Sequence, residues 1–293
     1  MLARRCPAYL IWAGETYVST GFVRNWNFEA SSPAFVDWQN EHVRRMLRRL
    51  RRPASHALRP VSGGATWAVY FLWSPDGRLL PHHEFTLRRL RDESFRVAVI
   101  CAAPDPASVP QALSGYSDAL YWKDLPGYDF SGYTLGLEEI ATHAEGADVL
   151  LLNDSVFGPL HPIGPLLGRW DLTGFTASNV IQNHIQSYAF SFRGFDRKKL
   201  AALRHIYPRS HCFNEARTVI ACQEVPQARI ASRCMTVGAH WYATGDPTLE
   251  IPLKLVDDAF PFLKKSLIEK YSGFIEPGAV QDCLRRFDHP AVA

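Results

Sequence analysis

The stretch that decides the fold is "VLLLNDSVFGPL", Val149 to Leu160. It starts with four apolar residues, 149–152, a run typical of a strand buried on both faces, because it is too short for an ordinary helix. Asn153, Asp154 and Ser155 follow directly. In an open α/β sheet, ligands bind just beyond the carboxyl ends of the strands, so this pattern predicts a strand that ends at a binding site. On this stretch alone, a simple turn capped by Asp154 and Ser155 is the alternative.

Strands and helices alternate around this stretch. The apolar and turn patterns predict strands at 66–73, 95–103, 118–124 and 149–152, with helices at 82–92, 105–113 and 133–143 between them. Such alternation predicts a mostly parallel, Rossmann-type α/β sheet flanked by helices, with right-handed crossovers. Further strands are expected at 172–178 and 184–195, then a helix at 196–206 and a more helical C-terminal part.

Composition and length place the chain among globular proteins. Its 293 residues, 47% apolar and 21% charged, suffice for one sizeable α/β domain with extensions or for two small domains. No apolar run approaches the roughly 18 residues of a membrane span, and the stretch at 9–13 is short for a signal peptide. The six cysteines form no C-x-x-C pair, which favours reduced thiols in a cytoplasmic protein.

Positive charge is concentrated near the N-terminus. Residues 1–60 hold ten Arg and no Lys against four acidic residues, and "RRMLRRLRR", Arg44 to Arg52, carries much of the excess. This run could form a basic helix on the anionic inner face of the cytoplasmic membrane, bind nucleic acid, or be a solvated face. Nucleic acid is the least favoured, because no basic stripe or binding motif follows. The Pro- and Gly-containing segment 51–65 is typical of a linker, which predicts a basic extension at 1–60 and a domain at 61–293.

Acidic residues follow two successive predicted strands. Asp129 comes after the third strand and Asp154 after the fourth. If these strand ends are neighbours, the two carboxylates line one crevice suited to Mg²⁺ or Mn²⁺ and, through the cation, to a diphosphate. Taken alone, Gly127, Tyr128 and Asp129 are more often a turn with a helix N-cap.

Four motifs carry a resemblance to a known family. In chain order they are "GYDFSGYTLGLEEI", "VLLLNDSVFGPL", "HIQSYAFSF" and "PFLKKSLI". Together they resemble the rhamnan synthesis protein F family of bacterial polysaccharide glycosyltransferases, over about residues 66–273. The elements Asn-Asp-Ser-x-x-Gly-Pro and Gln-Ser-Tyr are the most specific parts.

The resemblance implies a GT-A-like fold and a glycosyltransferase. It implies transfer of a sugar, rhamnose by the family's label, from a nucleotide-sugar donor to a glycan or lipid-linked glycan acceptor, as in lipopolysaccharide biosynthesis. The positions that match the family's motifs are Gly127, Tyr128, Asp129, Asn153, Asp154, Ser155, Gly158, Pro159, His184, Gln186, Ser187 and Tyr188. Glu224 occupies the family's usual acidic position.

Each group has a plausible task in glycosyl transfer. Asp154 would hold a divalent cation that stabilises the leaving nucleoside diphosphate, and Asp129 would bind the nucleoside or support the metal. Glu224 and His184 are candidates for the general base of an inverting enzyme. Each also has an ordinary structural interpretation: His184 as a hydrogen-bonded core residue and Glu224 as a solvated one.

The remaining donor residues and the lysines have similar alternatives. Gln186 and Tyr188 share one strand face while Ser187 points to the other, so only part of this motif can face the crevice. Lys264 and Lys265 could reach a diphosphate, although a basic helix end after Pro261 is the commoner explanation.

The sequence also bears on three other classes of function. A serine hydrolase built on Ser155 is disfavoured, because a nucleophile elbow needs Gly two residues before and after the serine, where this chain has Asn153 and Phe157. A dehydrogenase is disfavoured too, since no G-x-G-x-x-G follows the first strand. A non-catalytic module that binds a sugar nucleotide or glycan for a polysaccharide assembly system is the main alternative.

Overall fold

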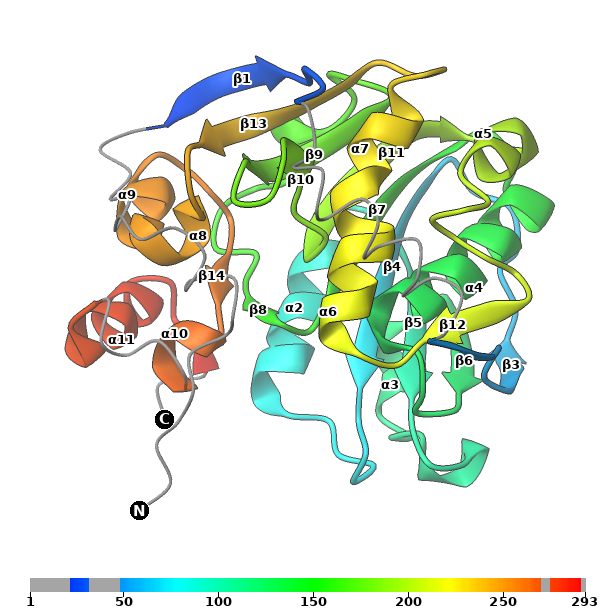
Figure 1. The fold of residues 1–293 in the computed structure, drawn as a ribbon. Helices are drawn as coiled ribbons and strands as arrows, with labels where there is room; N and C mark the ends of the chain where they lie inside the picture. Colours follow the sequence, from blue (N-terminus) through cyan, green and yellow to red (C-terminus); the bar gives the residue numbers. More distant parts are fainter. Residues whose placement is uncertain (1–21, 32–47, 270–274, 291–293) are drawn as a thin grey trace.

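The computed structural model describes residues 22–31, 48–269 and 275–290 and centres on one large mixed sheet (Figure 1). Among these residues ten strands run in the order β1-β13-β9-β11-β7-β4-β5-β6-β3, with β10 paired to β9. The strands of this sheet are β1 (Val23–Asn27), β3 (Ser55–Arg59), β4 (Thr66–Trp73), β5 (Arg96–Ala102), β6 (Ala119–Lys123), β7 (Ala147–Asn153), β9 (Leu172–Ser178), β10 (His184–Ile185), β11 (Ala189–Phe195) and β13 (Val237–Ala243). Two small ladders pair β2 (Arg49–Arg51) with β12 (His211–Phe213), and β8 (Val156–Phe157) with β14 (Leu263–Lys264).

The centre of the sheet is parallel, as the alternating pattern predicts. β4 pairs in parallel with both β5 and β7, and β5 with β6. Across the sheet these strands lie in the order β6-β5-β4-β7, which is 3-2-1-4 when they are numbered along the chain. This is the start of the doubly-wound arrangement, whose ligand crevice lies where the strand order reverses. Here that point lies between β4 and β7. The α/β fold class is therefore confirmed, although the sheet as a whole is mixed.

One antiparallel strand joins the two halves of the sheet. β11 lies between β7 and β9 and is antiparallel to both, while β13 is parallel to β9. The carboxyl ends of β4, β7, β9 and β13 therefore share one edge with the start of β11. The predicted strand at 184–195 is interrupted at this edge. Residues 186–188 lie between β10 and β11 and belong to neither strand.

Helices cover both faces of the sheet. Alternate residues of β4 divide between two cores: Trp67, Val69 and Phe71 pack with residues of α4, and Ala68, Tyr70 and Leu72 with residues of α2. The helices are α2 (Pro81–Asp92), α3 (Leu113–Tyr116), α4 (Tyr128–His143), α5 (Arg197–Ala202), α6 (Ala216–Val219), α7 (Val225–Ala231), α8 (Pro247–Glu250), α9 (Pro252–Asp257), α10 (Ser266–Glu269) and α11 (Pro277–Arg285), with 3₁₀ turns at Pro106–Ser108 and Gly164–Leu166.

Three predicted helices differ in extent from the observed ones. The helix predicted at 133–143 begins five residues earlier, at Tyr128. The one predicted at 105–113 is a 3₁₀ turn and the short α3, because Pro106 and Pro110 interrupt it. The helix at 196–206 ends at Ala202.

The segment predicted as a linker is part of the sheet. Residues 55–59 form β3, which pairs antiparallel with β6, and β1 pairs with β13 at the opposite edge. The described residues before position 61 therefore belong to the same fold as the rest. For residues 1–21 and 32–47, which lie outside the described ranges, the predicted basic extension stays a prediction.

The basic helix predicted at Arg44–Arg52 is wrong where the structure describes it. Residues 49–51 are the strand β2, and 44–47 lie outside the described ranges. Arg52 binds the Glu138 carboxylate through two hydrogen bonds of 3.1 and 2.6 Å, and Arg48 lies 3.5 Å from Glu215. These arginines thus have acidic partners in the fold, which gives no support to the predicted membrane contact.

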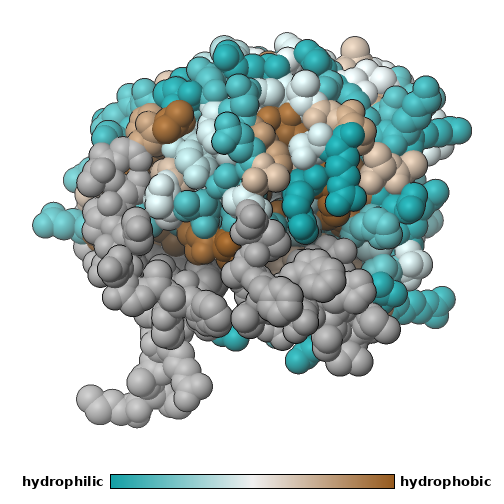
Figure 2. All heavy atoms as spheres, turned by 45° about the horizontal axis from the view of Figure 1, so that its top comes forward, coloured by the Kyte–Doolittle hydropathy of each residue, from teal (hydrophilic) through white to brown (hydrophobic). Residues whose placement is uncertain are grey.

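The C-terminal part is more helical, as predicted, and forms a smaller group beside the sheet (Figure 1). Leu249, Val256, Leu267 and Val280 form a small core there with Phe157 of β8. The face in Figure 2 is largely hydrophilic over its described residues, with hydrophobic ones in small groups. In the described part of the chain, the helices are too short or too polar to cross a membrane.

Two glycines allow α4 to lie against β4. A Cβ on Gly132 would collide with the Phe71 ring, and one on Gly136 would lie 2.6 Å from Cγ1 of Val69. Because α4 begins at Tyr128, this close approach fixes the position of Asp129 over the carboxyl end of β4.

We expect Gly132→Ala and Gly136→Ala each to destabilise the protein by about 1–3 kcal/mol, because each methyl group overpacks this helix–strand contact. Chemical denaturation measures the change. Gly115→Ala in α3 is the matched control, since its Cβ would meet nothing within 4 Å. Equal stability of all three variants would show that α4 has room to move away from β4.

Candidate active site

The site residues predicted from the sequence gather at the sheet edge where β4 and β7 end. Asn153, the last residue of β7, donates a hydrogen bond from Nδ2 to Oδ2 of Asp129, over 2.6 Å. The strands that precede these residues are not neighbours, because β4 and β5 lie between β6 and β7. The expectation of adjacent strand ends is therefore wrong, and Asp129 reaches β7 because α4 crosses the sheet.

Asn153 connects the two halves of the predicted site. Its Oδ1 accepts hydrogen bonds from the backbone N and the Oγ of Ser155, at 3.0 and 2.5 Å. Its Nδ2 holds Asp129, whose Oδ1 also accepts from the backbone N of Phe130, at 2.9 Å. The buried Asn153 thus holds the turn after β7 and the start of α4 together.

Asp154 joins the ends of the two central parallel strands. Its Oδ2 accepts a hydrogen bond from the backbone N of Trp73, the last residue of β4, at 3.0 Å. Burial raises the pKa of Asp154, and the Lys265 ammonium partly offsets that increase. The side chain therefore caps an exposed strand end at the point where the strand order reverses.

Burial also acts on Asp129. It raises the pKa of Asp129 to about 7, against the lowering effect of the Asn153 hydrogen bond, and the Glu224 carboxylate adds to the increase. Burial raises the pKa of the Tyr133 hydroxyl, and Asp129, Tyr207, Asp154 and Glu224 add to the increase, so these three carboxyl groups lie within electrostatic reach of Tyr133. A carboxyl group with a strongly perturbed pKa at such an edge is a good functional-site candidate.

The Gln-Ser-Tyr motif divides between two environments, as the sequence predicts, although its residues lie in the turn between β10 and β11 and not in a strand. Tyr188 OH donates to Oγ1 of Thr176, which in turn donates to Oε1 of Gln186, both over 2.6 Å. Ser187 faces the other way, where its N and Oγ donate to Oε2 of Glu224, the former over 3.1 Å. Ser187 therefore positions Glu224, whereas Gln186 and Tyr188 are buried on the opposite side.

Glu224 is held at the end of a π-helical turn. Residues 220–224 form this turn between α6 and α7, a local irregularity that is frequent at functional sites. The side chain is 18% exposed, so it is neither the solvated residue of the ordinary interpretation nor closed to a ligand.

His184 lies beside Glu224. His184 Nε2 lies 3.7 Å from Oε1 of Glu224, and His184 Nδ1 lies 2.8 Å from the carbonyl oxygen of Gln182. A carbonyl oxygen only accepts, so Nδ1 carries a proton and Nε2 is the acceptor in a neutral ring. Nε2 can therefore accept a hydrogen bond, and it lies beside the Glu224 carboxylate, the group that could act as a general base.

The structure adds two lysines to this edge. β14 pairs antiparallel with β8, so Lys264 lies opposite Val156 and the backbone N of Lys265 donates to the Ser155 carbonyl over 2.9 Å. The lysines lie in a short strand and a turn before α10, so the basic helix end is not their setting. Lys264 Nζ is 3.1 Å from Oδ2 of Asp246.

Asp246 is a residue of this edge that the sequence reasoning missed. Burial raises its pKa, but Lys264 and hydrogen bonds from Thr248 and Gln186 outweigh that effect and lower it. Its place in "GDP", an ordinary turn signal, gives no hint of these distant partners.

Gly127 and Tyr128 form the entrance to α4. Both have positive φ, 101° and 49°, and Asn214 Oδ1 accepts a hydrogen bond from the Gly127 N over 3.0 Å. Glycine is required at 127, because a Cβ would lie 2.6 Å from Oγ of Ser131. Tyr128 is 45% exposed, and its ring is available to a ligand.

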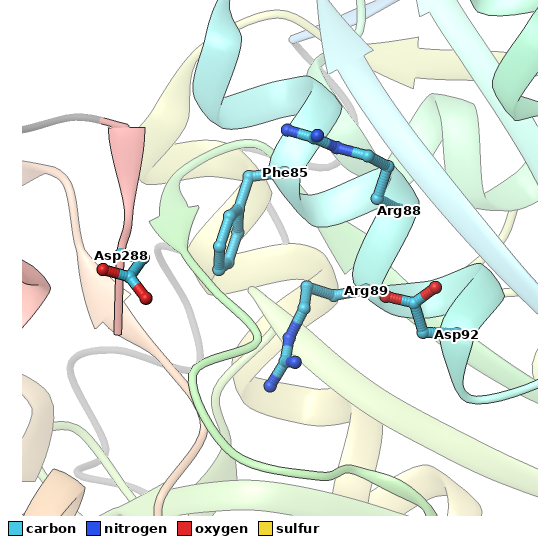
Figure 3. Close-up of a pocket in the computed structure, with 5 residues that line it drawn as sticks. All are labelled: Phe85, Arg88, Arg89, Asp92 and Asp288. Atoms are coloured by element: carbon cyan, nitrogen blue, oxygen red, sulfur yellow. The ribbon is translucent and has the colours of Figure 1, made fainter. Parts of the chain in front are cut away.

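A pocket of about 270 Å³ lies elsewhere, between α2 and the C-terminal segment (Figure 3). Its lining residues are Phe85, Arg88, Arg89, Asp92 and Asp288. None of the site residues predicted from the sequence lines it. We therefore assign the chemistry to the strand ends rather than to this pocket.

Within the described ranges, no three or more His, Cys, Asp or Glu side chains are grouped so that they could hold a metal ion. A magnesium ion commonly needs only one or two protein carboxylates, because phosphates and water complete its shell. The oxygen donors of Asp154 are compatible with that mode.

Asp129 predicts a pH-dependent stability. Its pKa of about 7 exceeds the ordinary 3.8, so the stabilisation from its bound proton is present below pH 4 and is lost as the pH rises through 7. Between pH 4 and 8, wild type should lose up to about 4 kcal/mol relative to Asp129→Asn in urea denaturation. The difference in unfolding free energy between wild type and Asp129→Asn removes the contributions of the other titratable groups. Asp92→Asn is the control, because Asp92 is exposed. A pH-independent difference would contradict the assignment.

The comparisons with known proteins leave the family open. No family model matches the chain. The chain is similar to the virulence protein VirA of Vibrio anguillarum, with the same match for the species and for its strain 775. The two sequences are 28% identical over 115 residues, which cover 38% of this chain and 37% of VirA. The match thus spans little more than a third of VirA.

A solved structure from Desulfovibrio desulfuricans G20, whose name assigns it to the nucleotide-diphospho-sugar transferases, superposes on 75% of this chain and 97% of its own. Its sequence identity is 10% and its TM-score 0.33, which is too low to support an argument about function. The resemblance to the rhamnan synthesis family therefore stays a prediction.

Proposed function

We propose that the chain is a glycosyltransferase that moves a sugar from a nucleotide-sugar donor to an acceptor hydroxyl. The observation that carries this proposal is the gathering of Asp129, Asn153, Asp154 and Glu224 at the carboxyl ends of β4 and β7. Open α/β sheets bind ligands at this reversal of strand order. Acidic and amide groups there suit a ligand that has both hydroxyl groups and a phosphate-bound cation.

The acceptor side of the reaction falls to Glu224. In an inverting transfer, its carboxylate takes the proton of the attacking hydroxyl, and the neighbouring His184 Nε2 can share that proton. Ser187 fixes Oε2 through two hydrogen bonds, so Oε1 is the oxygen available for this role.

The donor side falls to Asp154 and Asp129. Asp154 would hold Mg²⁺ or Mn²⁺, and the bound cation would neutralise the charge that develops on the departing diphosphate. Asp129 and Asn153 supply hydrogen-bonding groups for the nucleoside or sugar. Rhamnose as the sugar, and a bacterial surface polysaccharide or lipid-linked glycan as the acceptor, are proposed on the motif resemblance alone.

The donor site is tested by Asp154→Asn. Asparagine keeps an acceptor for the Trp73 N–H but loses the charge, so the melting temperature of the protein alone should stay equal or rise. Calorimetric titration with Mn²⁺ and a panel of sugar nucleotides should show that the variant has lost most metal-dependent binding. Asp92→Asn is the control. Equal affinities in wild type and Asp154→Asn would make Asp154 a structural cap.

The general base is tested by Glu224→Gln, which keeps an acceptor for Ser187. Transfer from a radiolabelled sugar nucleotide should fall by about 10²–10⁴-fold, whereas donor affinity should change little. Glu145→Gln, at an exposed position after α4, is the matched control. Donor binding by wild type without any turnover, in the presence of metal and acceptor, would support the non-catalytic module instead.

A further inference from the structure

The turn after β14 holds a second set of polar groups beside the candidate active site. Lys265 is fixed there by the β8–β14 ladder, since its backbone N donates to the carbonyl of Ser155, the residue after Asp154. Its ammonium lowers the pKa of Asp154 against the effect of burial, so the two charged groups lie within electrostatic reach.

Two histidines at the start of α2 meet the Lys265 side chain. Its Nζ lies 2.7 Å from Nε2 of His82 and 3.4 Å from Nε2 of His83. α2 follows β4 at the carboxyl edge of the sheet, so its first turn lies at the same edge as Asp154.

The hydrogen bonds of His83 decide its tautomer. The backbone N of Leu80 donates to His83 Nδ1 over 3.2 Å, so Nδ1 is an acceptor and the proton of the neutral ring lies on Nε2. The 3.4 Å contact between His83 Nε2–H and the Lys265 ammonium therefore joins two donors. It is not a hydrogen bond between the two groups, and one anionic acceptor can receive hydrogen bonds from both.

His82 has the complementary role. At 2.7 Å, its Nε2 accepts a hydrogen bond from the Lys265 ammonium. Burial, with a contribution from Lys265, lowers the pKa of His82 to about 4 and that of His83 to about 2. Both rings are therefore neutral near pH 7, and these tautomers persist.

The helix itself adds to the attraction for an anion. α2 has twelve residues and begins with Pro81, so His83 lies in its first turn, at the positive end of the helix dipole. Donor groups, a fixed ammonium and a helix N-terminus thus meet at the edge where Asp154 caps β4.

We propose that Lys265 Nζ and His83 Nε2 bind an anionic phosphate oxygen at this place, beside Asp154. The identification of this anion as the diphosphate of a sugar-nucleotide donor rests on the proposed function. The lysine and histidine would then stabilise the negative charge of the departing diphosphate. Lys264 pairs with Asp246.

The test is binding of inorganic pyrophosphate in EDTA, measured by calorimetry on the full chain. Wild type should bind, Lys265→Met should bind at least tenfold more weakly, and Lys265→Arg should recover part of the loss. Lys198→Met is the matched control, because Lys198 is exposed on α5, at the opposite edge of the sheet. Lys265→Gln is a second neutral variant should Lys265→Met not fold. Equal affinity of the wild type and the neutral variants, or no pyrophosphate binding by wild type, would overturn the proposal.

Parallel titrations distinguish the source of the anion. UDP binding at least as tightly as pyrophosphate, with the same loss in Lys265→Met, supports a nucleotide diphosphate. Orthophosphate bound more tightly than either would overturn the diphosphate assignment. If Lys265→Met loses pyrophosphate binding but the wild type transfers no sugar, the anion site is upheld and the glycosyltransferase is rejected. If the wild type transfers sugar but Lys265→Met binds pyrophosphate with unchanged affinity, the glycosyltransferase is upheld and the anion site is rejected.

Discussion

The contact between α4 and β4 determines the geometry of the candidate active site. Gly132 and Gly136 let the helix lie directly on Val69 and Phe71, closer than any larger residue would allow. The first turn of the helix then reaches the end of β7, where Asn153 binds Asp129. A methyl group at Gly132 or Gly136 would push the helix, and Asp129 with it, away from β4.

Around this contact, the mixed topology gathers groups that are far apart in the chain. Because β11 runs antiparallel between β7 and β9, its first residues lie at the same edge as the last residues of the parallel strands. Ser187 therefore meets Glu224, and Gln186 meets Thr176. A fully parallel sheet would have placed the start of that strand at the opposite edge.

Charge at this edge is balanced by segments distant in sequence. The buried carboxyl groups favour protonation in the absence of nearby cations, as the raised pKa values of Asp129 and Asp154 indicate. The C-terminal β14 brings Lys264 to Asp246 and Lys265 close to Asp154. The C-terminal segment is thus part of the electrostatics of the site as well as a packed appendage.

The sequence by itself determined the parallel centre of the sheet and the place of the polar groups at strand ends. Runs such as 149–152 followed by Asn-Asp-Ser are local signals, because burial on both faces and turn formation depend on residues adjacent in the chain. Strands β4, β5, β6, β7 and β9 appear close to where the pattern predicts them.

Only the tertiary structure decided which ends meet. Three strand pairings join segments up to about 160 residues apart in the chain: β3 with β6, β2 with β12, and β14 with β8. A short exposed strand such as Arg49–Arg51 has no sequence pattern that separates it from a basic helix or a linker. The partners of Glu224, Asp246 and Lys265 follow from those pairings, since a hydrogen bond depends on distance in space and not on distance along the chain.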